Sequence, residues 1–102
     1  MSDQELLELA AKAAGLDVNC SHGTPLFVGT RKTWNPLADD GDALRLAVKL
    51  EVGVLYCEMT GEAEARFHRG FDRLTEYGPN DPYAATRRAI VRAASAIGRT
   101  MP

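Results

Sequence analysis

The closing segment of the chain constrains the fold most, because it carries the start, the body and the stop of one long helix. Asp81 is the predicted N-cap, and Pro82 suits the first helical position, where no backbone N–H is needed. The alanine-rich run continues to Ile97 and closes at Gly98. Helical periodicity predicts a buried face of Thr86, Ile90, Ala93, Ala94 and Ile97, and an exposed ridge of Arg88, Arg92, Ser95 and Arg99.

Two further helices are predicted upstream. Ser2 and Glu5 have the spacing of a capping box at the start of a helix over residues 3–14, and Gly15 is a natural C-cap. The residues that share one face of this helix are Leu6, Leu9, Ala10 and Ala13. A shorter helix is predicted over residues 43–50, with Leu44, Ala47, Val48 and Leu50 buried and with Arg45 and Lys49 pointing outward.

Three acids, Asp39, Asp40 and Asp42, precede this second helix and allow two interpretations. A hard cation prefers oxygen ligands, but a calcium loop also needs a glycine and a distant glutamate at set positions, which are missing here. The spacing fits a helix N-terminus, where carboxylates accept from free amides and meet the positive end of the helix dipole. The sequence therefore predicts capping and no metal site.

Two hairpins are predicted between the helices. Residues 18–22 and 25–34 form the first, which Gly23, Pro25 and Gly29 make irregular, and residues 52–59 and 63–71 form the second. The sequence therefore predicts a single α+β domain over residues 1–102, with helices and strands in the order αββαββα. An antiparallel sheet of about four strands, built from the two hairpins, is expected under three helices.

Composition narrows the class of protein. The chain has 102 residues, of which 45% are hydrophobic and 25% charged, as in ordinary globular domains. The net charge of -2 argues against long nucleic acid as a partner. No apolar run approaches the roughly 20 residues that span a bilayer, and the N-terminus has acids where a signal peptide needs bases. We therefore expect a cytoplasmic protein with no membrane partner.

The chain offers little for catalysis. Its histidines are His22 and His68, and its cysteines, Cys20 and Cys57, are too few for a disulfide framework. A Cys57–His68 or Cys20–His22 pair would supply a nucleophile and a base, but no third orienting residue or known signature accompanies either pair. Glu58, Glu62 and Glu64 lie in or beside a hairpin turn, where solvated charge is usual. Zinc-hydrolase and phosphate-loop motifs are missing, so we expect no enzyme and no cofactor.

The bases are unevenly distributed, and this favours an anionic ligand. All bases in residues 66–102 are arginines, namely Arg66, Arg69, Arg73, Arg87, Arg88, Arg92 and Arg99. A GC-rich coding sequence would explain this choice, but guanidinium groups also suit phosphates and carboxylates. Trp34 either packs at the edge of the core or offers a stacking face, to which Tyr56 or Tyr83 could add another. The predicted ligand-binding residues are Trp34, Arg31, Arg66, His68, Arg88 and Arg92.

Two segments resemble a known group of proteins. The runs WNPLADDGDALRL, residues 34–46, and DPYAATRRAIV, residues 81–91, resemble small proteins of tailed phages and prophages, of the NinX-type and "phage ABA sandwich" groups. The resemblance covers nearly the full chain and implies the same helix and strand order. It carries over no catalytic residue, because these groups have mostly unknown functions.

The resemblance to small phage proteins implies that this protein has an accessory role in the cytoplasm of an infected bacterium. The leading expectation is a non-catalytic protein that counters host defence by sequestering a nucleotide-type immune signal. A homodimer or larger assembly is expected, because the core of a 102-residue chain is modest and the sheet must end in edges that need cover. The alternatives are a protein inhibitor of a host defence complex or regulator, which needs a surface patch with buried anchors, and a small enzyme that degrades the signal.

Overall fold

Three helices and six strands make up the part of the chain that the computed structural model describes, residues 2–19, 26–28, 32–67 and 73–102. The helices are α1 (Asp3–Ala14), α2 (Asp40–Leu50) and α3 (Pro82–Arg99). The strands are β1 (Val18–Asn19), β2 (Leu26–Val28), β3 (Lys32–Trp34), β4 (Val52–Cys57), β5 (Glu62–Phe67) and β6 (Arg73–Tyr77). The predicted mixture of three helices with antiparallel strands is confirmed.

The described strands form two separate antiparallel sheets, in the orders β1-β2-β3 and β4-β5-β6. The predicted single sheet of about four strands is therefore not confirmed. Residues 25–34 hold two strands instead of one, and β6 follows the predicted second hairpin as an additional strand. The sequence of β6, RLTEY, is mostly polar, so it lacks the apolar alternation by which a half-buried strand is recognised.

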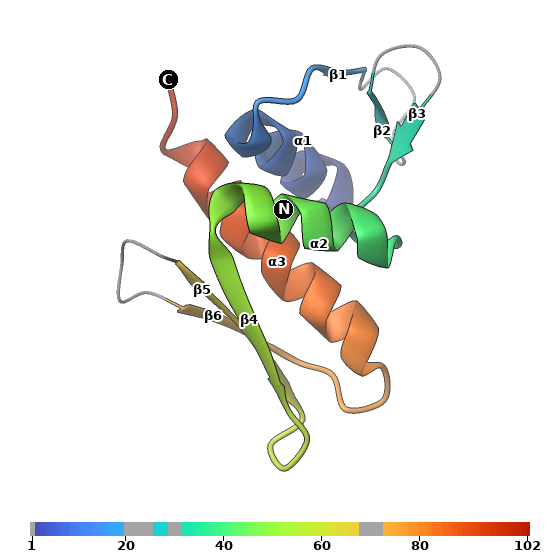
Figure 1. The fold of residues 1–102 in the computed structure, drawn as a ribbon, viewed down its shortest axis with the longest axis vertical. Coiled ribbons are helices and arrows are strands. Elements are labelled where there is room, and N and C mark those ends of the chain that lie inside the picture. The colour runs from blue at the N-terminus through green and yellow to red at the C-terminus, as the bar shows by residue number, and fades with distance from the viewer. Residues whose placement is uncertain (1, 20–25, 29–31, 68–72) are drawn as a thin grey trace.

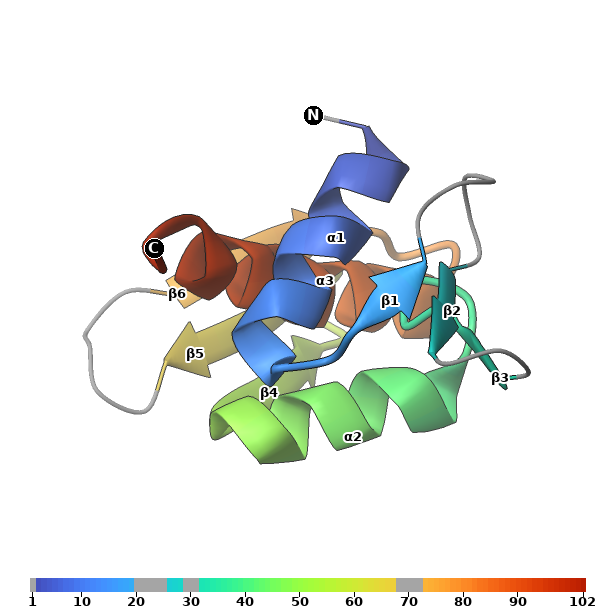
Figure 2. The ribbon, with the colours of Figure 1, turned by 90° about the horizontal axis from the view of Figure 1, so that it is seen from above.

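Helix α3 lies at the centre of the molecule, between α1 on one side and the β4-β5-β6 sheet on the other (Figure 1). Seen from above, α1 crosses in front of α3, α2 lies beside them, and the small first sheet lies toward one end of α2 and α3 (Figure 2). The part of α3 that packs inward is mostly made of small side chains, with Ala89, Ala93 and Ala94 fully buried beside the larger Ile90 and Val91. Small side chains allow close approach, and Ala63 and Ala65 of β5 continue the same tightly packed core.

The predicted caps at Ser2, Gly15 and Asp81 are confirmed, whereas α3 continues through the predicted stop at Gly98 to Arg99, and α2 begins at Asp40 instead of residue 43. The Ser2 hydroxyl accepts from the backbone N–H of Glu5 at 3.2 Å, and the Asp81 carboxylate accepts from that of Ala84 at 3.1 Å. Gly15 ends α1 with a φ of 71°, a left-handed conformation that glycine adopts without steric cost.

Several predicted faces are wrong. Leu44 and Val48 of α2 are 61% and 70% exposed instead of buried, because α2 packs inward with the face that contains Ala43, Leu46 and Ala47. In α1 the buried face is Leu6, Leu7, Ala10, Ala11 and Ala14, so Leu9 and Ala13 are only half-buried. Ser95, predicted on the exposed ridge of α3, is 1% exposed. α3 is covered on several sides, so its periodicity alone could not define one buried stripe.

Candidate ligand-binding site

The turn between β3 and α2 is fixed by the acids that precede the helix. The Asp39 carboxylate accepts from the backbone N–H of Asp42 at 2.8 Å, which confirms the predicted capping. Asp42 is 6% exposed, and its carboxylate accepts from the backbone N–H of Asn35 at 3.0 Å and from Arg45 at 2.8 Å. These acids therefore have structural partners, and the described part of the chain holds no group of three or more potential metal ligands.

This turn brings Trp34 against α2 and the end of α1, where a hollow of about 160 Å³ opens. Its lining residues are Ala14, Leu16, Trp34, Asp42, Arg45, Leu46 and Lys49. Trp34 is 5% exposed, so it is a core residue as well as part of the wall. The hollow therefore combines apolar side chains from three elements with polar groups from α2 alone, an arrangement typical of small-molecule sites.

The polar rim of the hollow carries two bases one helical turn apart, Arg45 and Lys49. The guanidinium of Arg45 lies 2.8 Å from an Asp42 carboxylate oxygen and 3.8 Å from one of Asp39, so its charge is partly neutralised. Lys49 is exposed and forms no ion pair with the residues that the structure describes. Its ammonium group is therefore available to an anionic ligand.

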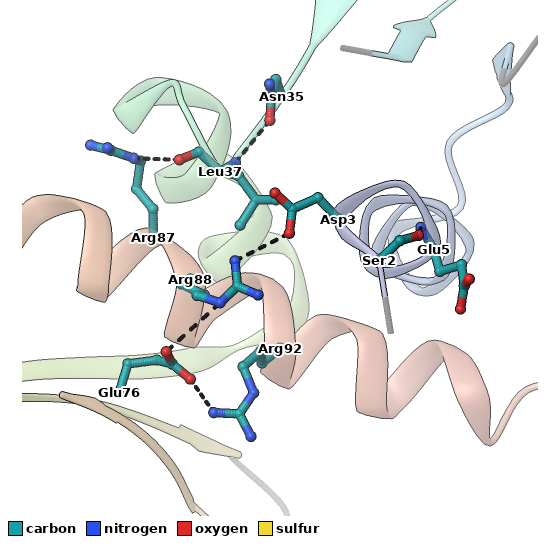
Figure 3. Close-up of polar contacts among 9 residues, drawn as sticks. All are labelled: Ser2, Asp3, Glu5, Asn35, Leu37, Glu76, Arg87, Arg88 and Arg92. Carbon is teal, nitrogen blue, oxygen red and sulfur yellow. Dashed lines mark hydrogen bonds and ion pairs between the residues drawn. The ribbon is translucent and has the colours of Figure 1, made fainter. Parts of the chain in front are cut away.

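Arg88 and Arg92, which the sequence places in the ligand site, lie elsewhere and contact acids of the protein (Figure 3). Both guanidinium groups reach the Glu76 carboxylate of β6, and Arg88 also contacts Asp3 of α1 at 3.2 Å. Arg92 additionally donates to the carbonyl of Thr75 at 3.2 Å. The predicted exposed basic ridge is thus, at these two positions, a half-exposed ion-pair network that joins α3 to α1 and β6.

Other arginines are paired as well. Arg66 and Arg73 contact the two oxygens of the Glu64 carboxylate at 2.9 and 3.0 Å. Arg87 donates to the carbonyl of Leu37 and to Asp40 at 2.8 and 2.6 Å (Figure 3 shows the first of these). Each of these guanidinium groups already has a carboxylate, so the arginine-rich composition does not create a free basic surface at these positions.

The structure does not bring the predicted ligand residues together. Arg66 lies on the face of β5 opposite Ala65, which is buried under α3, so the sheet separates it from Arg88 and Arg92. Trp34 belongs to a different hollow from all three. Arg31 and His68 lie outside the described residues, as do Cys20 and His22.

Cys57 is the thiol that the structure describes. Hydrogen bonds lower the pKa of the Cys57 thiol by stabilising its thiolate. The largest effect comes from the Thr60 hydroxyl, and smaller ones come from the backbone N–H groups of Thr60 and Met59. The thiol opens on a hollow of about 220 Å³ on the outer side of the β4-β5-β6 sheet, which Glu62 and Glu64 also line. His68, the predicted partner of this thiol, lies outside the described residues, so the structure does not test the Cys57–His68 pair.

Tyr56 and Tyr83 do face a common hollow, but it is not the one that Trp34 lines. It has a volume of about 550 Å³ and is lined by Tyr56, Glu58, Pro79, Pro82, Tyr83 and Thr86. Its charged group is an acid, Glu58, so it does not favour an anion. The hollow at Trp34 is therefore the better candidate for the predicted anionic ligand.

Sequence reasoning identified Trp34 but missed the residues that surround it. Arg45 and Lys49 were recognised only as the outward face of a helix, which is a signal that many solvated helices share. Ala14 and Leu16 join the site because α1 ends beside α2, a tertiary contact that no local pattern encodes.

None of the described helices is both long and apolar enough to cross a membrane. No protein-family model, curated protein or solved structure matches the chain.

Proposed function

We propose that the protein is a non-catalytic binding protein that holds a small anionic ligand with a flat ring in the hollow at Trp34. The observation that carries the proposal is the placement of Trp34, Leu16 and Leu46 around an apolar hollow whose rim carries Lys49. A flat ring gains from burial against apolar and aromatic walls, and an anionic group gains from a nearby ammonium.

The dimensions of the hollow limit how much of a ligand it encloses. A cavity of roughly 150 Å³ holds one benzene ring, and the hollow measures about 160 Å³. A nucleobase would therefore fill the hollow, while the sugar and phosphates would lie over the rim beside Arg45 and Lys49. This geometry supports a nucleotide-type ligand of which only one ring is buried.

The resemblance to phage accessory proteins gives this binding activity a biological role. A phage protein that removes a nucleotide-type signal from solution would counter a host defence that depends on the signal. Such sequestration needs affinity and no bond cleavage. The acid within the hollow is Asp42, whose carboxylate is already engaged by Asn35 and Arg45, so the proposal assigns it no acid or base role.

A second candidate function, inhibition of a host protein, is favoured by a different observation. Leu44 and Val48 are large apolar side chains that α2 leaves 61% and 70% exposed. Exposed apolar groups of this kind serve as anchors at protein interfaces. This function does not require the hollow at Trp34, but it requires that Leu44 and Val48 are not covered by a second copy of the chain.

Thermal unfolding in the presence of cyclic dinucleotides and of ADP-ribose derivatives separates the two candidates. A ligand at 100 times its dissociation constant stabilises a folded protein by about 2.7 kcal/mol, which raises the melting temperature by several degrees. We expect such a rise for the natural chain and for Lys12→Glu, and a smaller one for Lys49→Glu. If no compound shifts the melting temperature, while the protein captures one stoichiometric host protein, inhibition replaces ligand binding as the function.

A further inference from the structure

Among the residues that the structure describes, exposed apolar side chains gather where α2 runs beside β4. Leu44 and Val48 project from α2, and Val54 and Leu55 from β4, with exposed fractions of 61%, 70%, 42% and 60%. The first three line a shallow groove of about 470 Å³ between the helix and the strand. In Figure 1 both elements, drawn in green, lie on the side of the molecule turned toward the viewer. These four residues define what we call the α2–β4 surface.

β4 is an edge strand whose sequence lacks the residues that usually protect edges. No described strand pairs with its outer side, and its sequence, VGVLYC, contains neither a charge nor a proline. The other edge strand of the same sheet, β6, carries Arg73 and Glu76, and charged side chains discourage pairing with another strand. The difference between the two edges indicates that β4 is the one suited to pairing.

We propose that a second copy of this chain covers the α2–β4 surface, with the two β4 strands paired antiparallel across a two-fold axis. A second copy presents the same unprotected strand and the same exposed helix face, as a two-fold interface requires. The charged residues that line the groove are Glu51 and Arg66, and Arg66 is already paired with Glu64, so the groove presents little free charge to a second copy.

Side chains of β4 alternate between the two sides of the sheet, and this alternation specifies a register for the pairing of the two β4 strands. Val52, Val54 and Tyr56 lie opposite Phe67, Ala65 and Ala63, and therefore on the side of the sheet that faces α3. Gly53 and Leu55 lie on the outer side. With Val54 on the two-fold axis, Leu55 of each copy lies opposite Gly53 of the other, and a Cβ built at Gly53 has no atom within 4 Å. The space above each glycine receives a leucine that is otherwise exposed.

The same register places the two α2 helices on one side of the combined sheet. A two-fold axis perpendicular to an antiparallel pair keeps the inner faces of both sheets on the same side. Leu44 and Val48 of one copy then face their counterparts across the axis, next to Val54. The proposed interface thus buries apolar groups on both sides of the sheet and pairs the free edge of β4. This dimer is independent of the ligand that we propose for the hollow at Trp34.

Molar mass measured by light scattering over a concentration series tests the proposal. We expect the natural chain to approach twice the chain mass of 11.1 kDa as its concentration rises. Val48→Glu places a charge in the interface at a position that is 70% exposed, so it should keep the fold and shift the dimer dissociation constant at least tenfold. Met59→Glu, at a residue 96% exposed in the turn after β4, is the matched control and should dimerise like the natural chain.

A cross-link tests the register. Val54→Cys, in a chain with Cys20→Ser and Cys57→Ser, should form an intermolecular disulfide under mild oxidation, because directly opposed Cα atoms are about 4.5–5.5 Å apart. Thr75→Cys on the protected edge strand should not form one. A natural chain that remains monomeric at high concentration, a Val48→Glu variant that dimerises unchanged, or a cross-link at Thr75→Cys instead of Val54→Cys would each overturn the proposal.

Discussion

Gly98 of α3 lies against the backbone of Leu9 of α1 so closely that a Cβ built on Gly98 would be 2.0 Å from the Leu9 carbonyl oxygen. The next atoms that it would meet, the carbonyl carbon and the Cα of Leu9, also belong to the main chain. No side-chain rotation relieves such a clash. The contact between α1 and α3 therefore depends on a glycine near the end of α3, where the sequence suggested only a helix stop.

Gly98→Ala should destabilise the protein. Alanine improves helix propensity by up to about 1 kcal/mol, but overpacking against a backbone typically costs about 1–3 kcal/mol or more. We expect the clash to dominate, with a net loss of about 2 kcal/mol and a melting temperature lower by roughly 10 °C. Thermal unfolding followed by circular dichroism measures this. Gly53→Ala, where the Cβ meets no atom of its own chain within 4 Å, should not lower the melting temperature at concentrations where the chain is monomeric. Equal stability of Gly98→Ala and the natural chain would show that the helices are not in this contact.

Glu76→Gln should weaken the attachment of α3 to β6. The Glu76 carboxylate is 20% exposed and receives Arg88 and Arg92, and a neutral amide loses both ion pairs. Because the arginines remain half-exposed, we expect a loss of only about 1–2 kcal/mol in the free energy of unfolding. Urea unfolding at low and at high salt measures it. The difference from the natural chain should shrink at high salt, whereas Glu62→Gln, which removes an exposed carboxylate, should have little effect.

Asp39→Ala should destabilise α2 by about 1 kcal/mol, since the orphan amide of Asp42 loses its acceptor. Urea unfolding compared with Asp17→Ala, at an exposed position outside the helices, measures this loss. If the two variants were equally stable, Asp39 would not be the cap.

Thr60→Val should raise the pKa of the Cys57 thiol, because its largest stabilising contact, the Thr60 hydroxyl, is removed. A lowered pKa means that the reactive thiolate forms at lower pH, so the alkylation rate of the natural thiol should rise at lower pH than that of Thr60→Val. Iodoacetamide kinetics across pH, in chains with Cys20→Ser, measure both midpoints. Thr75→Val removes a hydroxyl from the same hollow without touching the thiol and should leave the midpoint unchanged.

Local sequence patterns predicted the helices well because their signals are local. Ser2, Asp39 and Asp81 cap helices by contacts that span three residues, and a single sequence contains all that such contacts need. The number of strands and sheets was harder to predict, since β6 is mostly polar and its pairing with β5 depends on distant residues.

Of the residues that line the hollow, the sequence predicted only Trp34 as a ligand-binding residue. The others were missed because their place in the site also depends on contacts between distant residues. An arginine on a helix looks the same in sequence whether it faces solvent or a carboxylate from another element. Arg88 and Arg92 meet Glu76 only because α3 packs on β6. Lys49, by contrast, meets no carboxylate of the described residues and lines the hollow because α2 packs beside the end of α1.

The most direct test of ligand binding uses the fluorescence of Trp34, which is the single tryptophan of the chain and lines the hollow. Titration with cyclic dinucleotides and ADP-ribose derivatives should give a saturable change in emission for at least one compound. Lys49→Glu should weaken the apparent affinity at least tenfold, while Lys12→Glu, the same charge change at the end of α1, should leave it unchanged. An emission that no compound alters, or equal affinities for Lys49→Glu and the natural chain, would contradict the proposed site.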